Sequence, residues 1–463
     1  MAQAFDLIII GAGPGGYPAA LRAAEDGRRV AVIEKEELGG TCLNHGCIPT
    51  KTLLHASGLY RRLQEAQDAG LMAAEAHVDM ARLQERRLEV IASLREGIAA
   101  QFRKKGVTLF TGTGLITDRG KVLVSSEKEE ILLTAPHILI AAGAKPVVPP
   151  IPGIDVPGVE DSAGLLARKE PYDSLIIIGG GVIGMEFASF YSDLGKKVTV
   201  VEAMDRILPG MDREISQNLK MILKKRGADI HTKASVTRVE KMETGGFVCY
   251  YEEKGQALSI AAEGLLAAAG RRADGESVWS DRLREASGTE RGRIPVDENY
   301  QTRIPGIYAV GDVTGGIQLA HAATAEGLLA LDHMEGREPS LDRRVIPSCV
   351  YTDPEIACAG LTCEEAKASG ISVKTAKYIM SLNGKSVLSG QERGFIRLVA
   401  REDNGKIVGA QLMCARATDM IGELELAVSR GVTAGELAGI IHPHPTFGEG
   451  IGEAARQLQW EKA

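Results

Sequence analysis

Two stretches of the chain repeat one pattern of residues. Residues 6–34 read DLIIIGAGPGGYPAALRAAEDGRRVAVIE, and residues 174–202 read SLIIIGGGVIGMEFASFYSDLGKKVTVVE. In each, a short apolar run leads into G-x-G-x-x-G, then an amphipathic stretch, then a second apolar run that ends in an acidic residue. Short apolar runs of this kind are typical of buried parallel strands. The repeat predicts two strand–loop–helix–strand units, each able to bind a dinucleotide.

The glycines and acids of the repeat have separate physical roles. The first glycine permits a tight turn, the second lets the backbone approach a pyrophosphate, and the third lets helix and strand pack closely. The pyrophosphate then lies at the helix N-terminus, and the terminal carboxylate accepts hydrogen bonds from the ribose. The predicted residues are Gly11, Gly13, Gly16 and Glu34 in the first unit and Gly179, Gly181, Gly184 and Glu202 in the second.

Two dinucleotide sites in one chain indicate electron transfer between a flavin and a nicotinamide. The carboxylate of Glu202 would repel the 2′-phosphate of NADP, so NAD is the expected nicotinamide. The segments HILIAAGAKP (137–146) and GLLAAAGRRAD (264–274) are interpreted as exits from the two units. We therefore predict an FAD domain formed by 1–145 and 271–340, an NAD domain formed by 146–270, and a third domain formed by 341–463.

The third domain lacks a glycine fingerprint. GFIRLVARE and KIVGAQLMCA resemble strands, and the spans 418–432 and 449–459 resemble helices. The predicted fold class is α/β, with two Rossmann-like domains and an α+β C-terminal domain that forms a subunit interface. Earlier in the chain, a helix with a buried face is predicted from apolar residues spaced by three and four: Ile91, Leu94, Ile98 and Phe102.

Composition limits the classes of partner and the compartment. The formal net charge of -7 over 463 residues disfavours a nucleic acid or an anionic membrane surface as partner. The first apolar run, Leu7 to Ile10, is short and follows no basic region, so no signal peptide is predicted. No run reaches the roughly 18 apolar residues of a membrane span. The expected location is the cytoplasm.

Two of the seven cysteines lie close together in GGTCLNHGCIPTK (39–51). A static Cys42–Cys47 disulfide would not suit a reducing compartment, and the spacing does not match the C-x₂-C pairs of structural zinc sites. No metal site is predicted. Gly46 and Pro49 can distort a helix that begins here, and a helix N-terminus lowers a thiol pKa. We interpret the pair as a redox couple, and the other five cysteines as buried or incidental thiols: Cys249, Cys349, Cys358, Cys363 and Cys414.

These motifs resemble those of the flavin-dependent pyridine nucleotide–disulfide oxidoreductases over essentially the whole chain. The motifs that carry the resemblance are GAGPGG (11–16), GGTCLNHGCIPTK (39–51), GGGVIGME (179–186), GIYAVGDV (306–313), LAHAATAEG (319–327) and HPTFGE (444–449). Within that family the chain is most similar to the dihydrolipoamide dehydrogenases. The segments that favour this branch are VVEAMDRILPGMD (200–212), YTDPEIACAG (351–360) and IHPHPTFGEGIGEA (441–454).

The resemblance implies roles for individual side chains. Cys47 is the thiol beside the flavin and forms the charge-transfer thiolate, and Cys42 is the interchange thiol that substrate attacks. Lys51 lies near the flavin and pairs with Glu186. The remaining residues expected at the cofactors are Gly40, Thr41, Gly114, Ala142, Gly143, Asp312, Leu319 and Ala320 for FAD, and Val182, Ile183, Val236 and Gly270 for NAD. Judged alone, Asp312 is more typical of a helix N-cap or a turn residue than of a ligand-binding residue.

The chemistry also requires an acid–base group, because one substrate thiol must lose a proton before it attacks. His444 is the candidate, since histidine titrates near neutral pH. Glu449 would fix its tautomer. His442 is interpreted as a packing residue.

The implied reaction oxidises dihydrolipoamide through the disulfide and FAD and reduces NAD⁺. The implied partners are a second copy of the chain, whose interface shares the active sites, and lipoyl domains of 2-oxoacid dehydrogenase or glycine cleavage complexes. Two alternatives stay open: an NAD-linked reductase of another small disulfide or of a metal ion, and a redox-inert flavoprotein scaffold. The chain departs from the family pattern at His45 and at Arg272-Ala273-Asp274, which leaves the disulfide substrate open.

Overall fold

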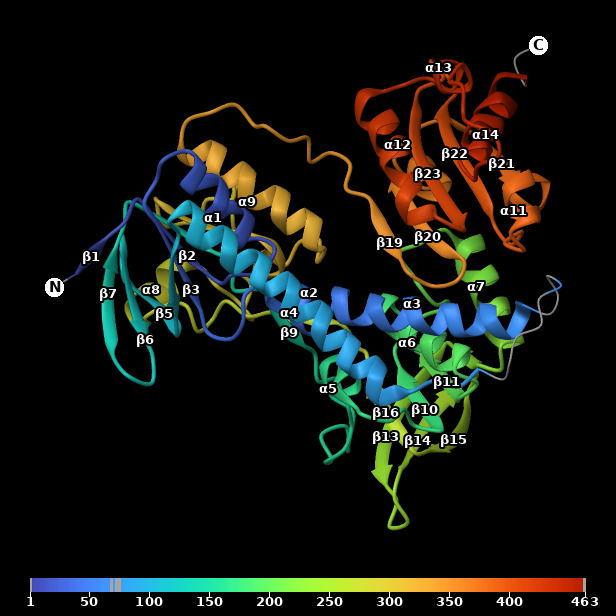
Figure 1. The fold of residues 1–463 in the computed structure, drawn as a ribbon, viewed down its shortest axis with the longest axis horizontal. Coiled ribbons are helices and arrows are strands. Elements are labelled where there is room, and N and C mark those ends of the chain that lie inside the picture. The colour runs from blue at the N-terminus through green and yellow to red at the C-terminus, as the bar shows by residue number, and fades with distance from the viewer. Residues whose placement is uncertain (1, 67–69, 71–75, 461–463) are drawn as a thin grey trace.

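The first nucleotide-binding unit is a parallel sheet covered on both faces (Figure 1). The computed structural model describes residues 2–66, 70 and 76–460. Neighbouring strands follow the order β18-β8-β2-β3-β4, and all four residues of the central strand β2 are buried, as a doubly covered sheet requires. The strands are β2 (Leu7–Ile10), β3 (Val30–Glu34), β4 (Thr108–Thr111), β8 (His137–Ile140) and β18 (Ile307–Ala309).

Alternate residues of β2 point to opposite faces of the sheet and pack into two different core clusters. Leu7 and Ile9 pack with the helices α1 (Tyr17–Glu25) and α9 (Ala320–Met334). Ile8 and Ile10 pack against a second, smaller sheet on the other face. That sheet has the order β1-β7-β6-β5 and consists of β1 (Gln3–Ala4), β5 (Thr113–Asp118), β6 (Lys121–Ser125) and β7 (Glu130–Thr134).

The second unit repeats this plan. Its parallel sheet has the order β12-β11-β10-β16, and β10 pairs with β11 as β2 pairs with β3. Leu175 and Ile177 face the helices α6 (Val182–Asp193) and α7 (Arg213–Lys225). Ile176 and Ile178 face the antiparallel sheet β13-β14-β15. The strands are β10 (Ser174–Ile178), β11 (Lys197–Glu202), β12 (Asp229–Thr232), β13 (Ala234–Lys241), β14 (Phe247–Glu253), β15 (Gln256–Ala262) and β16 (Gly264–Ala267).

A two-stranded link joins the units. Strand β9 (Ala144–Pro146) leads out of the first unit and pairs antiparallel with β17 (Arg271–Ala273), which leads back into it. The chain therefore crosses between the two units at the segments 137–146 and 264–274, each of which has an apolar run followed by a glycine turn. The shorter elements here are α5 (Ser162–Ala167), α8 (Asp281–Ser287) and the 3₁₀ turn η2 (Gly311–Thr314).

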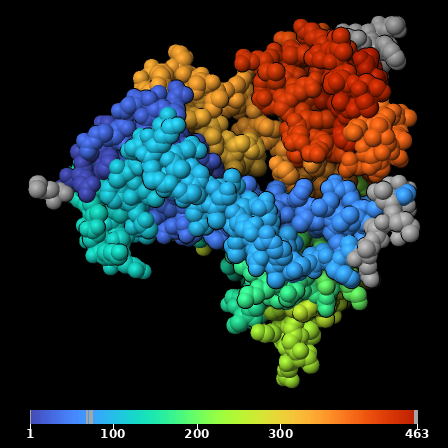
Figure 2. All heavy atoms as spheres, viewed as in Figure 1, coloured from blue at the N-terminus to red at the C-terminus, as the bar shows by residue number. Residues whose placement is uncertain are grey.

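The C-terminal domain is an antiparallel sheet with helices, which confirms the predicted fold class. Its strand order is β19-β20-β23-β22-β21. The two predicted helical spans correspond to α12 (Ala417–Arg430) and α14 (Glu449–Trp460). The remaining elements are β19 (Ser348–Val350), β20 (Glu355–Gly360), α10 (Cys363–Ala368), β21 (Val373–Ile379), η3 (Met380–Leu382), α11 (Gly384–Leu388), β22 (Phe395–Arg401), β23 (Ile407–Cys414) and α13 (Ala434–Ala438). Figure 2 shows this domain and the two nucleotide-binding units as three lobes.

The long helices α3 (Cys47–Gln64) and α4 (Met80–Lys105) extend from the first unit to the second (Figure 1), and the short helix α2 (Gly40–Asn44) precedes α3. On α4, Ile91, Ile98 and Phe102 are buried as predicted. The prediction for Leu94 is wrong, because its side chain is 44% exposed. At 3.6 residues per turn, position 94 points about 60° away from position 91, whereas 98 and 102 point within about 20° of it. No helix within the described ranges is long and apolar enough to cross a membrane.

Candidate active site

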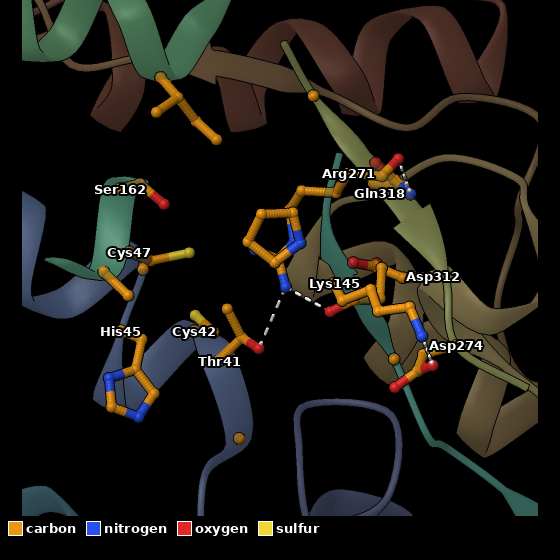
Figure 3. A pocket seen from close by; sticks show the side chains of 18 of the residues that line it. Thr41, Cys42, His45, Cys47, Lys145, Ser162, Arg271, Asp274, Asp312 and Gln318 are labelled. Carbon is orange, nitrogen blue, oxygen red and sulfur yellow. Dashed lines mark hydrogen bonds and ion pairs between the residues drawn. The ribbon is translucent and has the colours of Figure 1, made fainter. Parts of the chain in front are cut away.

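A cavity of about 1520 Å³ lies between the three lobes of the chain. Both glycine-rich loops, the thiol segment after Gly40 and the β19 edge of the C-terminal domain contribute to its walls. Figure 3 shows part of the wall, with Thr41, Cys42 and Cys47 on one side and Arg271 and Asp312 across from them. Every residue predicted to contact a cofactor lines this cavity except Gly16 and Gly184.

The prediction that Gly16 and Gly184 contact cofactors is therefore not supported by their positions, and packing gives the reason. A Cβ atom on Gly16 would lie 2.0 Å from the Gly11 carbonyl oxygen, and one on Gly184 would lie 2.1 Å from the Gly179 carbonyl oxygen. These third glycines let each helix approach its own loop.

The second glycines differ, and they fit the predicted dinucleotides. A Cβ on Gly181 would meet no atom within 4 Å, and one on Gly13 would meet only the Gly40 Cα, at 3.8 Å. Both backbones therefore face open cavity, where a side chain would occupy the space that a pyrophosphate needs.

The two acidic residues at the strand ends are held in the same way. Glu34 accepts hydrogen bonds from the backbone N–H groups of Ala12 at 2.7 Å and Glu36 at 2.9 Å. Glu202 accepts them from Gly180 at 2.5 Å and Met204 at 2.6 Å. Each carboxylate oxygen has a further lone pair for a ribose hydroxyl. Both acids line the cavity, so the two units present equivalent ribose acceptors.

A break between two helices brings the thiols together. Cys42 lies in α2, and Cys47 is the first residue of α3. Gly46 between them has φ −139° and ψ −108°, outside the helical region, so the chain changes direction there. Both cysteines are free thiols, and the Cys42 thiol donates a hydrogen bond to the Cys47 sulfur.

That hydrogen bond makes the two sulfurs chemically unequal. It lowers the pKa of Cys47 to about 7, and the positive charge of Lys51 adds to the effect against the opposing cost of burial. The same hydrogen bond, together with burial, raises the pKa of Cys42 well above its ordinary value. In the reduced pair, ionisation is therefore favoured at Cys47 over Cys42.

Lys51 and Glu186 form an ion pair at the cavity wall. The Lys51 Nζ atom lies 2.8 and 2.7 Å from the two carboxylate oxygens of Glu186. Glu186 is only 3% exposed, so this charge needs a partner. The pair joins α3 of the first unit to α6 of the second.

Three residues that the sequence analysis did not assign to the site also line the cavity. Tyr351 follows β19 and contacts both members of the ion pair. Arg271 extends into the cavity, and its Nη2 atom lies 3.4 Å from the Thr41 Oγ1. Cys349 is predicted above to be a buried or incidental thiol, and burial raises its pKa to about 11, which keeps it a thiol at neutral pH. Only a folded structure brings these residues to the thiol pair, since the sequence separates them by more than 220 positions.

The departures from the family pattern border the same cavity. His45 is exposed at its edge, next to Cys42 (Figure 3). Asp274 pairs with Lys145 at 2.5 Å and so ties β17 to β9. Within the described part of the chain, no three His, Cys, Asp or Glu side chains are arranged to hold a metal ion.

His444 and Glu449 form a pair outside this cavity. The His444 Nδ1 atom lies 2.9 Å from a Glu449 oxygen, and the other oxygen accepts the backbone N–H of Thr446 at 2.9 Å. Both interactions lower the pKa of Glu449, and the hydrogen bond from the Thr446 amide has the larger effect. The His444 side chain is 77% exposed, and no described residue from 441–449 lines the cavity of its own chain. His442 is largely buried and contacts Glu423 at 3.1 Å.

A reactive thiol pair between two dinucleotide-binding units defines a flavin- and nicotinamide-dependent thiol–disulfide redox enzyme. The chain belongs to the pyridine nucleotide-disulphide oxidoreductase family, whose model matches residues 5–327, with the dimerisation domain of that family at residues 346–455. Members of this family bind FAD and a pyridine nucleotide.

The relatives differ in their recorded activities. The chain is 40% identical to a dihydrolipoyl dehydrogenase of Bacillus subtilis, with 98% of both chains covered. It is 37% identical to the dihydrolipoyl dehydrogenase of Geobacillus stearothermophilus, over 97% of this chain and 95% of that one. Among solved structures, it resembles RclA, the HOCl-induced flavoprotein disulfide reductase of Escherichia coli, in its copper(II) complex. That match has a TM-score of 0.88 and 31% identity, over 99% of this chain and 100% of RclA.

Proposed function

We propose that this chain is a dihydrolipoyl dehydrogenase, which oxidises lipoyl-bound dihydrolipoamide and reduces NAD⁺. The observation that carries the proposal is the unequal thiol pair in the cavity, with its low-pKa sulfur on Cys47 beside Lys51. The 40% identity to a dihydrolipoyl dehydrogenase supports the choice of substrate. The lipoyl domains of 2-oxoacid dehydrogenase or glycine cleavage complexes are the proposed partners.

The exchange steps follow from the two thiols. In the oxidised enzyme Cys42 and Cys47 form a disulfide, and a deprotonated substrate thiol attacks the Cys42 sulfur. The S–S bond breaks and Cys47 leaves as a thiolate, the form that its lowered pKa favours. The second substrate thiol then attacks the mixed disulfide, which releases lipoamide and leaves a proton on Cys42. Bound FAD would supply the two-electron relay between the thiols and NAD⁺. As the Cys42–Cys47 disulfide re-forms, Cys42 gives up its proton.

The base in this scheme is His444 of a second subunit. The side chain is exposed and is oriented by Glu449, but it lies away from the cavity of its own chain. A twofold dimer would place it at the thiols of the other chain, and each dimer would contain two equivalent sites. The dimerisation domain that carries His444 supports this arrangement. The imidazole would remove the substrate proton, and Glu449 would stabilise the charged ring.

A second candidate function uses the same residues, with electrons flowing in the opposite direction. The likeness to RclA, whose name records a disulfide reductase, favours reduction of another disulfide at the expense of a reduced pyridine nucleotide. One assay separates the two functions. We expect NAD⁺ reduction by dihydrolipoamide to exceed, in kcat/KM, the reduction of oxidised glutathione, thioredoxin or a metal ion by NADH. Faster turnover of one of those acceptors would contradict the proposal.

Glu202 is expected to select NAD over NADP. A 2′-phosphate would bring negative charge against a buried carboxylate whose two oxygens are already held by amides. Replacing Glu202 with alanine or arginine should lower kcat/KM for NAD⁺ by roughly tenfold or more and reduce the discrimination against NADP⁺. The measurement is the ratio of kcat/KM for the two nucleotides. Flavin content serves as control, because the equivalent acid Glu34 is unchanged. Equal use of both nucleotides by the unmodified enzyme would refute the assignment.

A further inference from the structure

Tyr351 contacts both members of the Lys51–Glu186 ion pair. Its aromatic ring lies under the Lys51 ammonium, with the Nζ atom 4.7 Å from the ring centroid. Its backbone N–H donates to the Glu186 Oε1 atom at 3.1 Å. A cation held over an aromatic face is attracted by the negative face of the ring. One residue therefore supplies a partner to each of the two charges.

The segment that carries Tyr351 is firmly attached to the helices that carry the pair. Thr352 is 3% exposed, and its hydroxyl donates to the Pro354 carbonyl at 2.9 Å. Asp353 pairs with Arg61, further along α3. Arg61 also pairs with Asp193 of α6 at 3.1 Å. The turn after β19 is thus anchored on both helices, which fixes the backbone of Tyr351 beside Lys51, although the tyrosine itself is 39% exposed.

The charges around Lys51 show what its position controls. Glu186 of α6 and Tyr351 of the C-terminal domain contact Lys51 directly. Its positive charge also acts to lower the pKa values of Cys42 and Cys47. Its ammonium is among the groups that lower the pKa of Cys47, whereas the negative charge of Glu186 raises it. Partial burial is the largest of the effects that raise the pKa of Tyr351 to about 12. Its phenol is therefore neutral, and the ring interacts with Lys51 through its aromatic face.

We propose that Tyr351 is a positioning residue that holds Lys51 and Glu186 in place and thereby sets the ionisation of Cys47. The C-terminal domain then contributes to the thiol chemistry of its own chain, in addition to the histidine that it offers to the other subunit. This inference rests on the proposed function only in requiring bound FAD beside Cys47. It does not depend on which disulfide is the substrate.

The test follows the Cys47 thiolate by absorbance instead of turnover. The FAD-loaded protein is reduced with two electrons by dithiothreitol, and the long-wavelength band of a thiolate beside a flavin is titrated against pH. Tyr351→Leu keeps an apolar side chain and the backbone N–H but lacks the aromatic face. We expect it to raise the apparent pKa by about half a pH unit, which is about threefold in the ionisation equilibrium. Tyr351→Phe keeps the face and should titrate like the unmodified protein.

Two further variants show whether the effect passes through Lys51. Lys51→Met should raise the apparent pKa by itself, and Tyr351→Leu added to Lys51→Met should then produce no additional shift. Tyr250→Leu is the matched control. It removes a similar contact, with Arg238 4.2 Å from the ring centroid, in the β13-β14 sheet, and should leave the titration unchanged.

Three results would overturn the proposal. The first is an unshifted titration in Tyr351→Leu, and the second is an equal shift in Tyr351→Phe. The third is a full shift that persists when Lys51 is methionine. If Tyr351→Leu fails to retain flavin, Tyr351→Met replaces it in every comparison. Because dihydrolipoamide is not used, a failure here is distinguishable from a failure of the proposed substrate.

Discussion

Replacing Cys47 with serine is expected to abolish both turnover and the long-wavelength absorbance of the reduced enzyme. Serine cannot form the disulfide, and its hydroxyl does not ionise near pH 7, as Cys47 does with a pKa of about 7. We expect kcat with dihydrolipoamide to fall by roughly 10⁴-fold or more, as when a member of a catalytic unit is removed. Steady-state assay and a spectrum of the dithiothreitol-reduced protein measure the two effects.

Cys42 should behave differently, although its loss also stops turnover. Cys42→Ser retains a hydroxyl that can donate to the Cys47 sulfur, so the absorbance band should persist near neutral pH. Cys42→Ala removes that donor, which is the largest cause of the low pKa of Cys47. Because a hydrogen bond to the charged form favours ionisation, its loss should move the midpoint of the band to higher pH.

Cys363→Ser is the control for these substitutions. Cys363 begins the short helix α10 and does not line the cavity, so the variant should keep normal turnover and a normal spectrum. Full dihydrolipoamide turnover in either Cys42→Ser or Cys47→Ser would show that electrons do not pass through this pair. A normal band in Cys47→Ser would assign the thiolate to another sulfur.

His444→Gln is expected to lower dihydrolipoamide turnover by about 10² to 10⁴-fold, the usual contribution of a general acid–base group. The proton on the substrate thiol then has no acceptor, whereas reduction of the flavin by NADH needs no such acceptor and should remain fast. Stopped-flow measurement of flavin reduction, beside steady-state turnover, separates the two. His55→Gln is the control, because His55 is exposed on α3 and does not line the cavity.

Mixed dimers test whether His444 acts on the other subunit. One subunit carries Cys42→Ser and the other carries His444→Gln. If the sites are shared, one site of the hybrid has both defects and the other has neither, so up to half of the normal activity should return. If each site belongs to one chain, every site has one defect. An inactive, verified hybrid would therefore refute the shared site.

Much of the fold could be predicted because its signals are local. In each fingerprint the loop glycines and the strand-end acid lie within one strand–helix–strand unit, so their spacing reports the geometry directly. The thiol pair is equally local, with Cys42 and Cys47 on either side of one helix break. The error at Leu94 also has a local origin. The prediction treats the three-residue step from Ile91 to Leu94 as part of the buried face, but that step turns the side chain away from the face and into solvent.

The electrostatic surroundings of the thiols could not be predicted in the same way. Lys51 contacts a ring 300 positions later, at Tyr351, and Thr41 contacts a guanidinium 230 positions later, at Arg271. No periodicity or propensity connects such residues. Their proximity arises only when the C-terminal domain and the β9–β17 link pack against the helices α3 and α6.

The sequence by itself determined the two dinucleotide-binding units, the thiol pair and the acid–base candidate, because each depends on residue types at short spacing. Only the tertiary structure decided that Tyr351 and Arg271 lie beside the thiol segment and that Cys349 lines the same cavity. The physical reason is that these properties depend on distance, burial and charge between segments that are remote in the chain.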